Sequence, residues 1–164
     1  MKGSTHRLAW LLVSLAFAGC YRPPSEQVLV QRFESNRSGF DRLLTLTTAD
    51  SNYRRISGGE IPPRGMGASR YQEYLALFRE LGIEGGVTRD LAPPGGVFVI
   101  ASSDVPIGGK GRSVGYVYSA VPLSPLVKNL DQPSLPIEIH RGSGRYTVYR
   151  ELQDHWYLYY DSSW

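Results

Sequence analysis

The hydrophobic pattern of the chain changes its period once, near Val87, and this change restricts the possible folds. Before it, apolar residues recur every three or four positions, as on one face of an amphipathic helix. After it, apolar and polar residues alternate, as in strands with one buried face. Helices followed by strand hairpins predict an α+β domain, with two helices packed on one face of an antiparallel sheet of about five strands.

The first helical pattern covers residues 25–49 and predicts one long amphipathic helix. Ser25 suits the N-cap position, since its hydroxyl can accept a hydrogen bond from a free backbone N–H of the first turn. Gly39 lowers the helix propensity by up to about 1 kcal/mol relative to alanine. We therefore expect a bend at Gly39 or a close approach of the helix to the sheet.

The second helical pattern covers residues 69–81. Ser69 and Gln72 have the spacing of a capping box, and Gly82 is suited to end the helix because glycine tolerates the left-handed conformation. Aromatic residues on the apolar faces of both helices, together with one from the last strand, are expected in the core: Phe33, Phe40, Phe78 and Trp156.

Strands are expected at residues 87–91, 97–102, 113–121, 145–152 and 155–160, with a shorter one at 53–56. Residues 97–100 are apolar on both faces, which predicts a central position in the sheet. Residues 93–96 and 153–154 are expected to form hairpin turns. Between the third and fourth of the five strands, Ser124 is expected to start a single helical turn that reaches Leu130.

The N-terminus has the features of a secretory signal. Lys2 and Arg7 precede an apolar run over residues 8–18, which is too short to span about 30 Å of hydrocarbon. The small residues 18–19 stand directly before Cys20, the only cysteine, and resemble the lipobox of bacterial lipoprotein precursors. In that class the cysteine is lipidated and becomes the mature N-terminus.

This resemblance implies three regions: a signal peptide with a signal helix over residues 1–19, a lipidated Cys20 with a short tether over 20–24, and one α+β domain over 25–164. The membrane is then a partner through the lipid on Cys20. Tyr21 follows the cysteine where an aspartate would favour the inner membrane, so we expect the outer membrane, facing the periplasm, in a Gram-negative source.

Three further motifs resemble small bacterial lipoproteins of unknown function. They are Leu-Phe-x-x-Leu-Gly at residues 77–82, Gly-Tyr-x-Tyr at 115–118 and Trp-Tyr-Leu-Tyr-Tyr at 156–160. The resemblance implies an envelope lipoprotein, and it carries over no catalytic residue.

Charge and histidine content argue against several classes of function. Removal of residues 1–19 takes away Lys2 and Arg7, so 16 of the 18 basic residues remain against 15 acidic ones. A net charge of +1 gives no support for nucleic-acid binding. His140 and His155 have no second ligand at metal-binding spacing, so we expect no metal and no cofactor.

Residues 111–115 fit the G-x-S-x-G pattern of serine hydrolases, with Ser113 in the nucleophile position. Asp131 and His140 follow in the serine, acid, histidine order. A nucleophile elbow joins a strand to a helix, whereas here a glycine-rich loop precedes the serine and a strand pattern follows it. A small serine hydrolase is therefore the alternative function, and a non-catalytic binding or interaction module is favoured.

The last strand suggests where such a module would bind. Tyr157 and Tyr159 share the strand face that does not carry Trp156, and Tyr149 lies on the neighbouring strand. If the helices cover only the other face, these rings form an exposed surface for an envelope protein or a glycan, with charge supplied by Lys110 and Arg112. In the alternative arrangement, residues 122–136 fold over the tyrosines and make a second, minor core.

Overall fold

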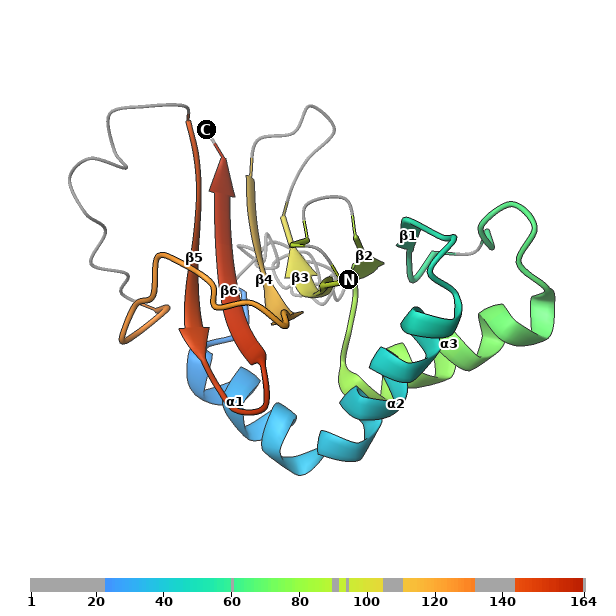
Figure 1. The fold of residues 1–164 in the computed structure, drawn as a ribbon, viewed down its shortest axis with the longest axis horizontal. Coiled ribbons are helices and arrows are strands. Elements are labelled where there is room, and N and C mark those ends of the chain that lie inside the picture. Colours follow the sequence, from blue (N-terminus) through green and yellow to red (C-terminus); the bar gives the residue numbers. More distant parts are fainter. Residues whose placement is uncertain are drawn as a thin grey trace, which may run out of the picture.

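The computed structural model describes residues 23–59, 61–89, 92–93, 95–104, 111–131 and 144–163. Figure 1 shows the order of the elements along the chain. They are α1 (Glu26–Ser35), α2 (Arg37–Ala49), β1 (Arg55–Ile56), α3 (Ala68–Leu81), β2 (Gly86–Thr88), β3 (Val97–Ser103), β4 (Gly111–Tyr118), β5 (Arg145–Glu151) and β6 (Trp156–Ser163). The predicted signal helix and Cys20 lie outside the described residues.

Within the described residues, the strands form one antiparallel sheet in the order β1-β2-β3-β4-β6-β5. The α+β class is therefore confirmed. The expected number of about five strands is corrected to six, because β1 pairs with β2 through Arg55 opposite Thr88 and Ile56 opposite Val87. β3 lies between β2 and β4, as its two-sided apolar pattern predicts.

The prediction of one helix over residues 25–49 is wrong, because the helix is interrupted at Asn36. This residue has φ −127° and ψ 30°, and its side-chain Nδ2 donates to the carbonyl oxygen of Arg32 at 2.9 Å. Asparagine side chains compete in this way with the backbone bonds of a helix. The break separates α1 from α2 three residues before Gly39, where the bend was expected.

Gly39 instead provides a close approach between helices. A Cβ atom at this position would lie 2.8 Å from Cδ2 of Leu81 on α3. The expected approach was to the sheet, so the partner is corrected to α3. Gly82 ends α3 in the left-handed conformation, with φ 61° and ψ 42°, as predicted.

The predicted capping box of α3 is wrong. The helix begins at Ala68, one residue earlier than expected, and its N-cap residue is Gly67. No side-chain hydrogen bond caps this end within the described residues. A helix that already starts at Ala68 leaves Ser69 and Gln72 inside the first turns, so neither occupies the position that the capping box requires.

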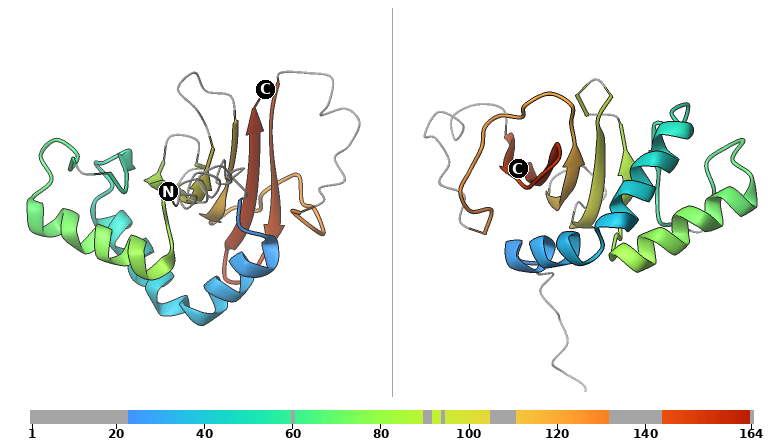
Figure 2. Two further views of the ribbon diagram at one scale, coloured as in Figure 1. Left: turned by 180° about the vertical axis from the view of Figure 1, so that it is seen from behind. Right: turned by 60° about the horizontal axis from the view of Figure 1, so that its bottom comes forward.

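The main core lies between the helices and one face of the sheet (Figure 2). The four aromatic residues predicted to be buried are each at most 2 % exposed, which confirms the prediction: Phe33, Phe40, Phe78 and Trp156. The Phe40 ring lies 4.5 Å from that of Tyr116 and 5.6 Å from that of Trp156, measured between centroids. Such tilted and edge contacts add to the stabilisation from burial.

Residues 119–131, called the edge segment below, follow β4 and are drawn in orange in Figure 1. The helical turn expected here is wrong. The backbone N–H of Val127 donates to the carbonyl of Tyr149 at 2.8 Å, and Tyr149 N–H donates to Pro125 at 3.0 Å. The segment therefore runs beside β5, at the edge of the sheet. Leu130 is buried on the face of the sheet that the helices cover, here called the helix face. Leu123 packs on the opposite face, here called the far face, so the segment passes from one face of the sheet to the other.

Candidate binding pocket

The predicted tyrosine surface is buried. Tyr157 and Tyr159 are 5 % and 2 % exposed, in a second apolar cluster with Phe98 and Val117. The rings of Phe98 and Tyr159 meet edge to face at 4.8 Å. Leu123 of the edge segment packs against this cluster. The expectation of an exposed platform is therefore wrong, and the alternative of a second minor core is the arrangement that the structure shows.

The remaining members of the predicted binding surface have different surroundings. Tyr149 is half-buried against the second cluster. Arg112 is exposed at the start of β4. Lys110 lies outside the described residues. The five positions therefore do not make one exposed patch among the described residues, where Arg112 is the one member of the set that is fully on the exposed side.

The structure separates two members of the predicted catalytic triad. Ser113 lies inside β4, and its Oγ is 2.9 Å from the hydroxyl of Tyr159 on the far face of the sheet. The next residue, Val114, points to the opposite face and lines a pocket there together with Asp131. His140 lies outside the described residues. Ser113 and Asp131 are thus on opposite faces of the sheet, and Ser113 is within a strand where an elbow needs a turn.

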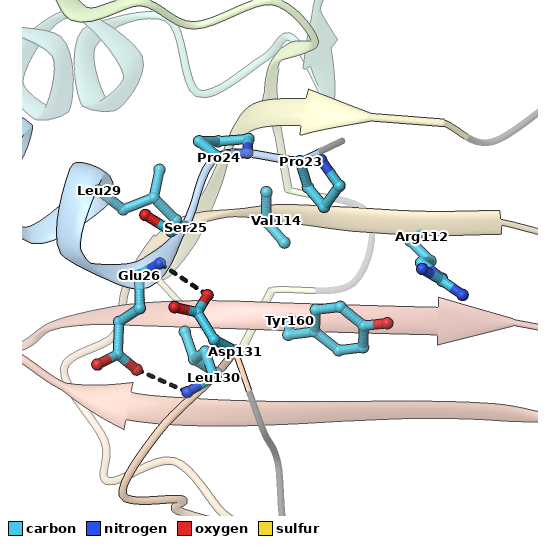
Figure 3. Close-up of a pocket in the computed structure, with 10 residues that line it drawn as sticks. All are labelled: Pro23, Pro24, Ser25, Glu26, Leu29, Arg112, Val114, Leu130, Asp131 and Tyr160. Atoms are coloured by element: carbon cyan, nitrogen blue, oxygen red, sulfur yellow. Dashed lines mark hydrogen bonds between the residues drawn. The ribbon is translucent and has the colours of Figure 1, made fainter. Parts of the chain in front are cut away.

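A pocket of about 430 Å³ lies on the helix face of the sheet, at the N-terminal end of α1 (Figure 3). Its size is typical of small-molecule sites, which span about 300 to 1,000 Å³. Its lining comes from the first residues of α1 and those that lead into it, from strands β4 and β6, and from the edge segment. The lining residues are Pro23, Pro24, Ser25, Glu26, Leu29, Arg112, Val114, Leu130, Asp131 and Tyr160.

At one end of the pocket, the carboxylates of Glu26 and Asp131 accept hydrogen bonds from other parts of the domain. Oε2 of Glu26 accepts a hydrogen bond from Leu130 N–H at 2.6 Å, and Oε1 accepts one from the Arg150 guanidinium. The backbone N–H of Glu26 donates to Oδ1 of Asp131 at 2.9 Å. Among the described residues the side chain of Ser25 makes no capping bond, so Asp131 caps the helix from 105 residues away. These bonds join α1, β5 and the edge segment.

The other end of the pocket carries a cation and a phenol. Figure 3 shows the hydroxyl of Tyr160 directed toward the end where Arg112 lies, away from Glu26. Tyr146 on β5 packs beside Tyr160, with their ring centroids 5.8 Å apart. Burial, followed by the neighbouring Tyr160 hydroxyl, raises the pKa of Tyr146 to about 12 although Arg112 lowers it. Tyr146 is therefore a neutral hydroxyl at physiological pH.

No family model matches this chain, and neither the curated proteins nor the solved structures include a match. The function is therefore argued from the pocket and from the sequence. The sequence predicts a binding role for Arg112 and a catalytic role for Asp131, but it does not predict that both lie in one pocket with Tyr160. The alternation along the strands could have indicated part of this pocket, because it places Arg112 and Val114 on the face that carries Trp156 and Tyr160.

Two further properties of the described ranges bear on the site. No helix in them is both long enough and apolar enough to cross a membrane. They contain no group of three or more histidine, cysteine, aspartate or glutamate residues arranged to hold a metal ion. His155 is exposed, and the centroid of its ring lies 6.2 Å from that of the Tyr118 ring.

Proposed function

We propose that the protein is a bacterial envelope lipoprotein, anchored by a lipid on Cys20, which acts as a non-catalytic binding module through this pocket. The observation that carries the proposal is the position of Pro23 and Pro24, which line the pocket and follow Cys20 by three and four residues. An extended chain spans at most about 3.6 Å per residue, so Pro23 lies within about 11 Å of Cys20. A lipid on Cys20 would hold the pocket at the membrane surface.

The signal sequence supports this location. The short apolar run and the small residues before Cys20 favour export, cleavage at the cysteine and acylation. Each buried methylene contributes about 0.8 kcal/mol, so two or three palmitate-like chains anchor a protein almost permanently. Because Tyr21 follows the cysteine, the proposal places the protein on the outer membrane, facing the periplasm, in a Gram-negative source.

The chemistry of the pocket favours binding over catalysis. Apolar walls formed by Leu29, Val114 and Leu130 combine with a few polar groups at the two ends of the pocket, which is the usual composition of a ligand site. The serine that the hydrolase alternative requires is hydrogen-bonded to Tyr159 on the other face of the sheet. The pocket is therefore the favoured site, and its ligand could be a small molecule or a group of an envelope protein or glycan.

Replacement of the lipid-accepting residue tests the anchor. We expect Cys20→Ser to abolish labelling by palmitate and to remove the protein from the membrane fraction of cells. Ser113→Ala is the matched control, because it leaves the proposed anchor and the pocket lining intact, and it should keep both the label and the location. Equal labelling and fractionation of wild type and Cys20→Ser would refute the proposed function.

A further inference from the structure

A cation, the guanidinium of Arg112, lies at one end of the pocket. Arg112 is exposed and, within the described residues, its guanidinium has no ion-pair partner. A guanidinium presents a planar fork of N–H donors that matches the oxygens of a phosphate. The hydroxyl of Tyr160 points to the same end and supplies a further donor (Figure 3). This end of the pocket is suited to an anion with several acceptor oxygens.

The acidic residues do not occupy the same end. The Glu26 carboxylate is paired with Arg150 and accepts a hydrogen bond from the N–H of Leu130, and its side chain is only 12 % exposed. Asp131 accepts the N–H of Glu26 at the start of α1. Figure 3 shows both carboxylates on the Leu130 side of the pocket, with the Tyr160 ring between them and Arg112. The pocket is therefore polarised, and an anion is favoured only beside Arg112.

The walls between these ends are apolar. Pro23, Pro24 and Val114 lie along one side, and Leu29 and Leu130 lie near the start of α1. An inorganic phosphate would leave this apolar surface in contact with water. A ligand that joins a phosphate to methylene groups would cover it, at about 25 cal/mol per Å² of apolar surface removed from water.

We propose that the pocket binds the phosphate of a phospholipid headgroup, with the Arg112 guanidinium and the Tyr160 hydroxyl as donors and the adjoining apolar walls against the glycerol and the first methylenes. This inference rests on the proposed function, because the anchor on Cys20 brings the pocket to the lipids of its own membrane. The bound lipid would fix the orientation of the domain on the bilayer, which a flexible anchor alone does not do.

The test uses the purified full-length mature protein, reconstituted into vesicles of equal parts phosphatidylglycerol and phosphatidylcholine with a trace of headgroup-photoactivatable phosphatidylglycerol. After flotation and irradiation, the adducts are mapped by peptide mass spectrometry. We expect them on the pocket peptides around Pro23, Arg112 and Leu130. Arg112→Gln should lower this yield about tenfold, as the loss of a charge-assisted hydrogen bond predicts. Tyr160→Phe, which keeps the ring, should lower it about fivefold.

Arg55→Gln is the control, because Arg55 is an exposed arginine on β1, at the opposite edge of the sheet from β5. It removes the same charge and should leave the pocket adducts unchanged. The inference would be overturned by adducts spread over the whole surface, or by equal yields of pocket adducts from Arg112→Gln and Arg55→Gln. In either case, flotation of the protein with the vesicles would still support the anchor. If added inorganic phosphate abolishes the pocket adducts, the site is assigned to free phosphate, and the inference of a phospholipid ligand is also overturned. A protein that fails to float would overturn the proposed function together with this inference.

Discussion

Glu26, in the first turn of α1, accepts a hydrogen bond from the backbone N–H of Leu130 at 2.6 Å, although 104 residues separate the two. The same carboxylate pairs with Arg150 on β5. One side chain thus connects the first helix, the edge strand and the edge segment, which are also the parts that surround the pocket. We infer that this carboxylate stabilises both the domain and the shape of the pocket.

Removal of this carboxylate should destabilise the protein. Glu26→Ala leaves the Leu130 N–H and the Arg150 guanidinium without their partner, and we expect the free energy of unfolding to fall by about 2 to 3 kcal/mol. Urea titration measures this change. Glu34→Ala, at an exposed position of the same helix, is the control and should change the free energy by less than about 0.5 kcal/mol. Equal effects of the two substitutions would contradict the role given to Glu26.

Gly115, in the Gly-Tyr-x-Tyr motif, allows β3 and β4 to pair closely. A Cβ atom at this position would lie 2.1 Å from the carbonyl oxygen of Val99, which is backbone and cannot rotate away. Gly115→Ala should therefore force the strands apart and cost about 2 kcal/mol or more. Gly59→Ala is the matched control, because its nearest neighbour would be 3.9 Å from the new Cβ. Similar denaturation midpoints for the two variants would show that β3 and β4 do not approach as described.

Stability should fall at high pH because of buried tyrosines. Burial raises the pKa of Tyr116, and burial followed by a hydrogen bond to Asp50 raises that of Tyr74, above the usual value of about 10. The folded protein therefore holds these protons more tightly than the unfolded chain does. The stability that results is complete below about pH 10 and is lost as the pH rises further.

Urea titrations at increasing pH measure this loss. We expect the midpoint to fall above about pH 10, and to fall less steeply in Tyr116→Phe, which has one phenol fewer to titrate. The same variant should lose about 1 kcal/mol at neutral pH, because the Tyr116 hydroxyl donates to the Leu29 carbonyl at 3.0 Å. A midpoint that rises with pH in this range would contradict the direction of the pKa shifts.

The sequence predicts those parts of the fold that depend on local pattern. Helical spacing identifies Phe33, Phe40 and Phe78 as core residues, and alternation identifies Trp156, because burial of one face imposes each period. Gly82 marks a helix end for an equally local reason, since the left-handed conformation favours glycine. The break at Asn36 is also local, and the tendency of asparagine to bond the backbone is the signal that could have revealed it.

The sequence does not predict which surfaces are covered. Alternation shows that Tyr157 and Tyr159 share a face, but their burial depends on Leu123 in the edge segment and on Phe98 in another strand. The pocket has the same origin, since Arg112 and Leu130 come from segments whose meeting depends on the sheet order. The order of Ser113 and Asp131 along the chain likewise does not show that they lie on opposite faces.

The central claim is that Cys20 is lipidated and holds the pocket at a membrane. The most direct test is the intact mass of the mature protein purified from the cell envelope, with fragmentation of its N-terminal peptide. We expect residues 1–19 to be absent and Cys20 to be the first residue, with a mass increased by that of a diacylglyceryl group with or without a further acyl chain. An unmodified Cys20, or cleavage at another bond, would contradict the claim.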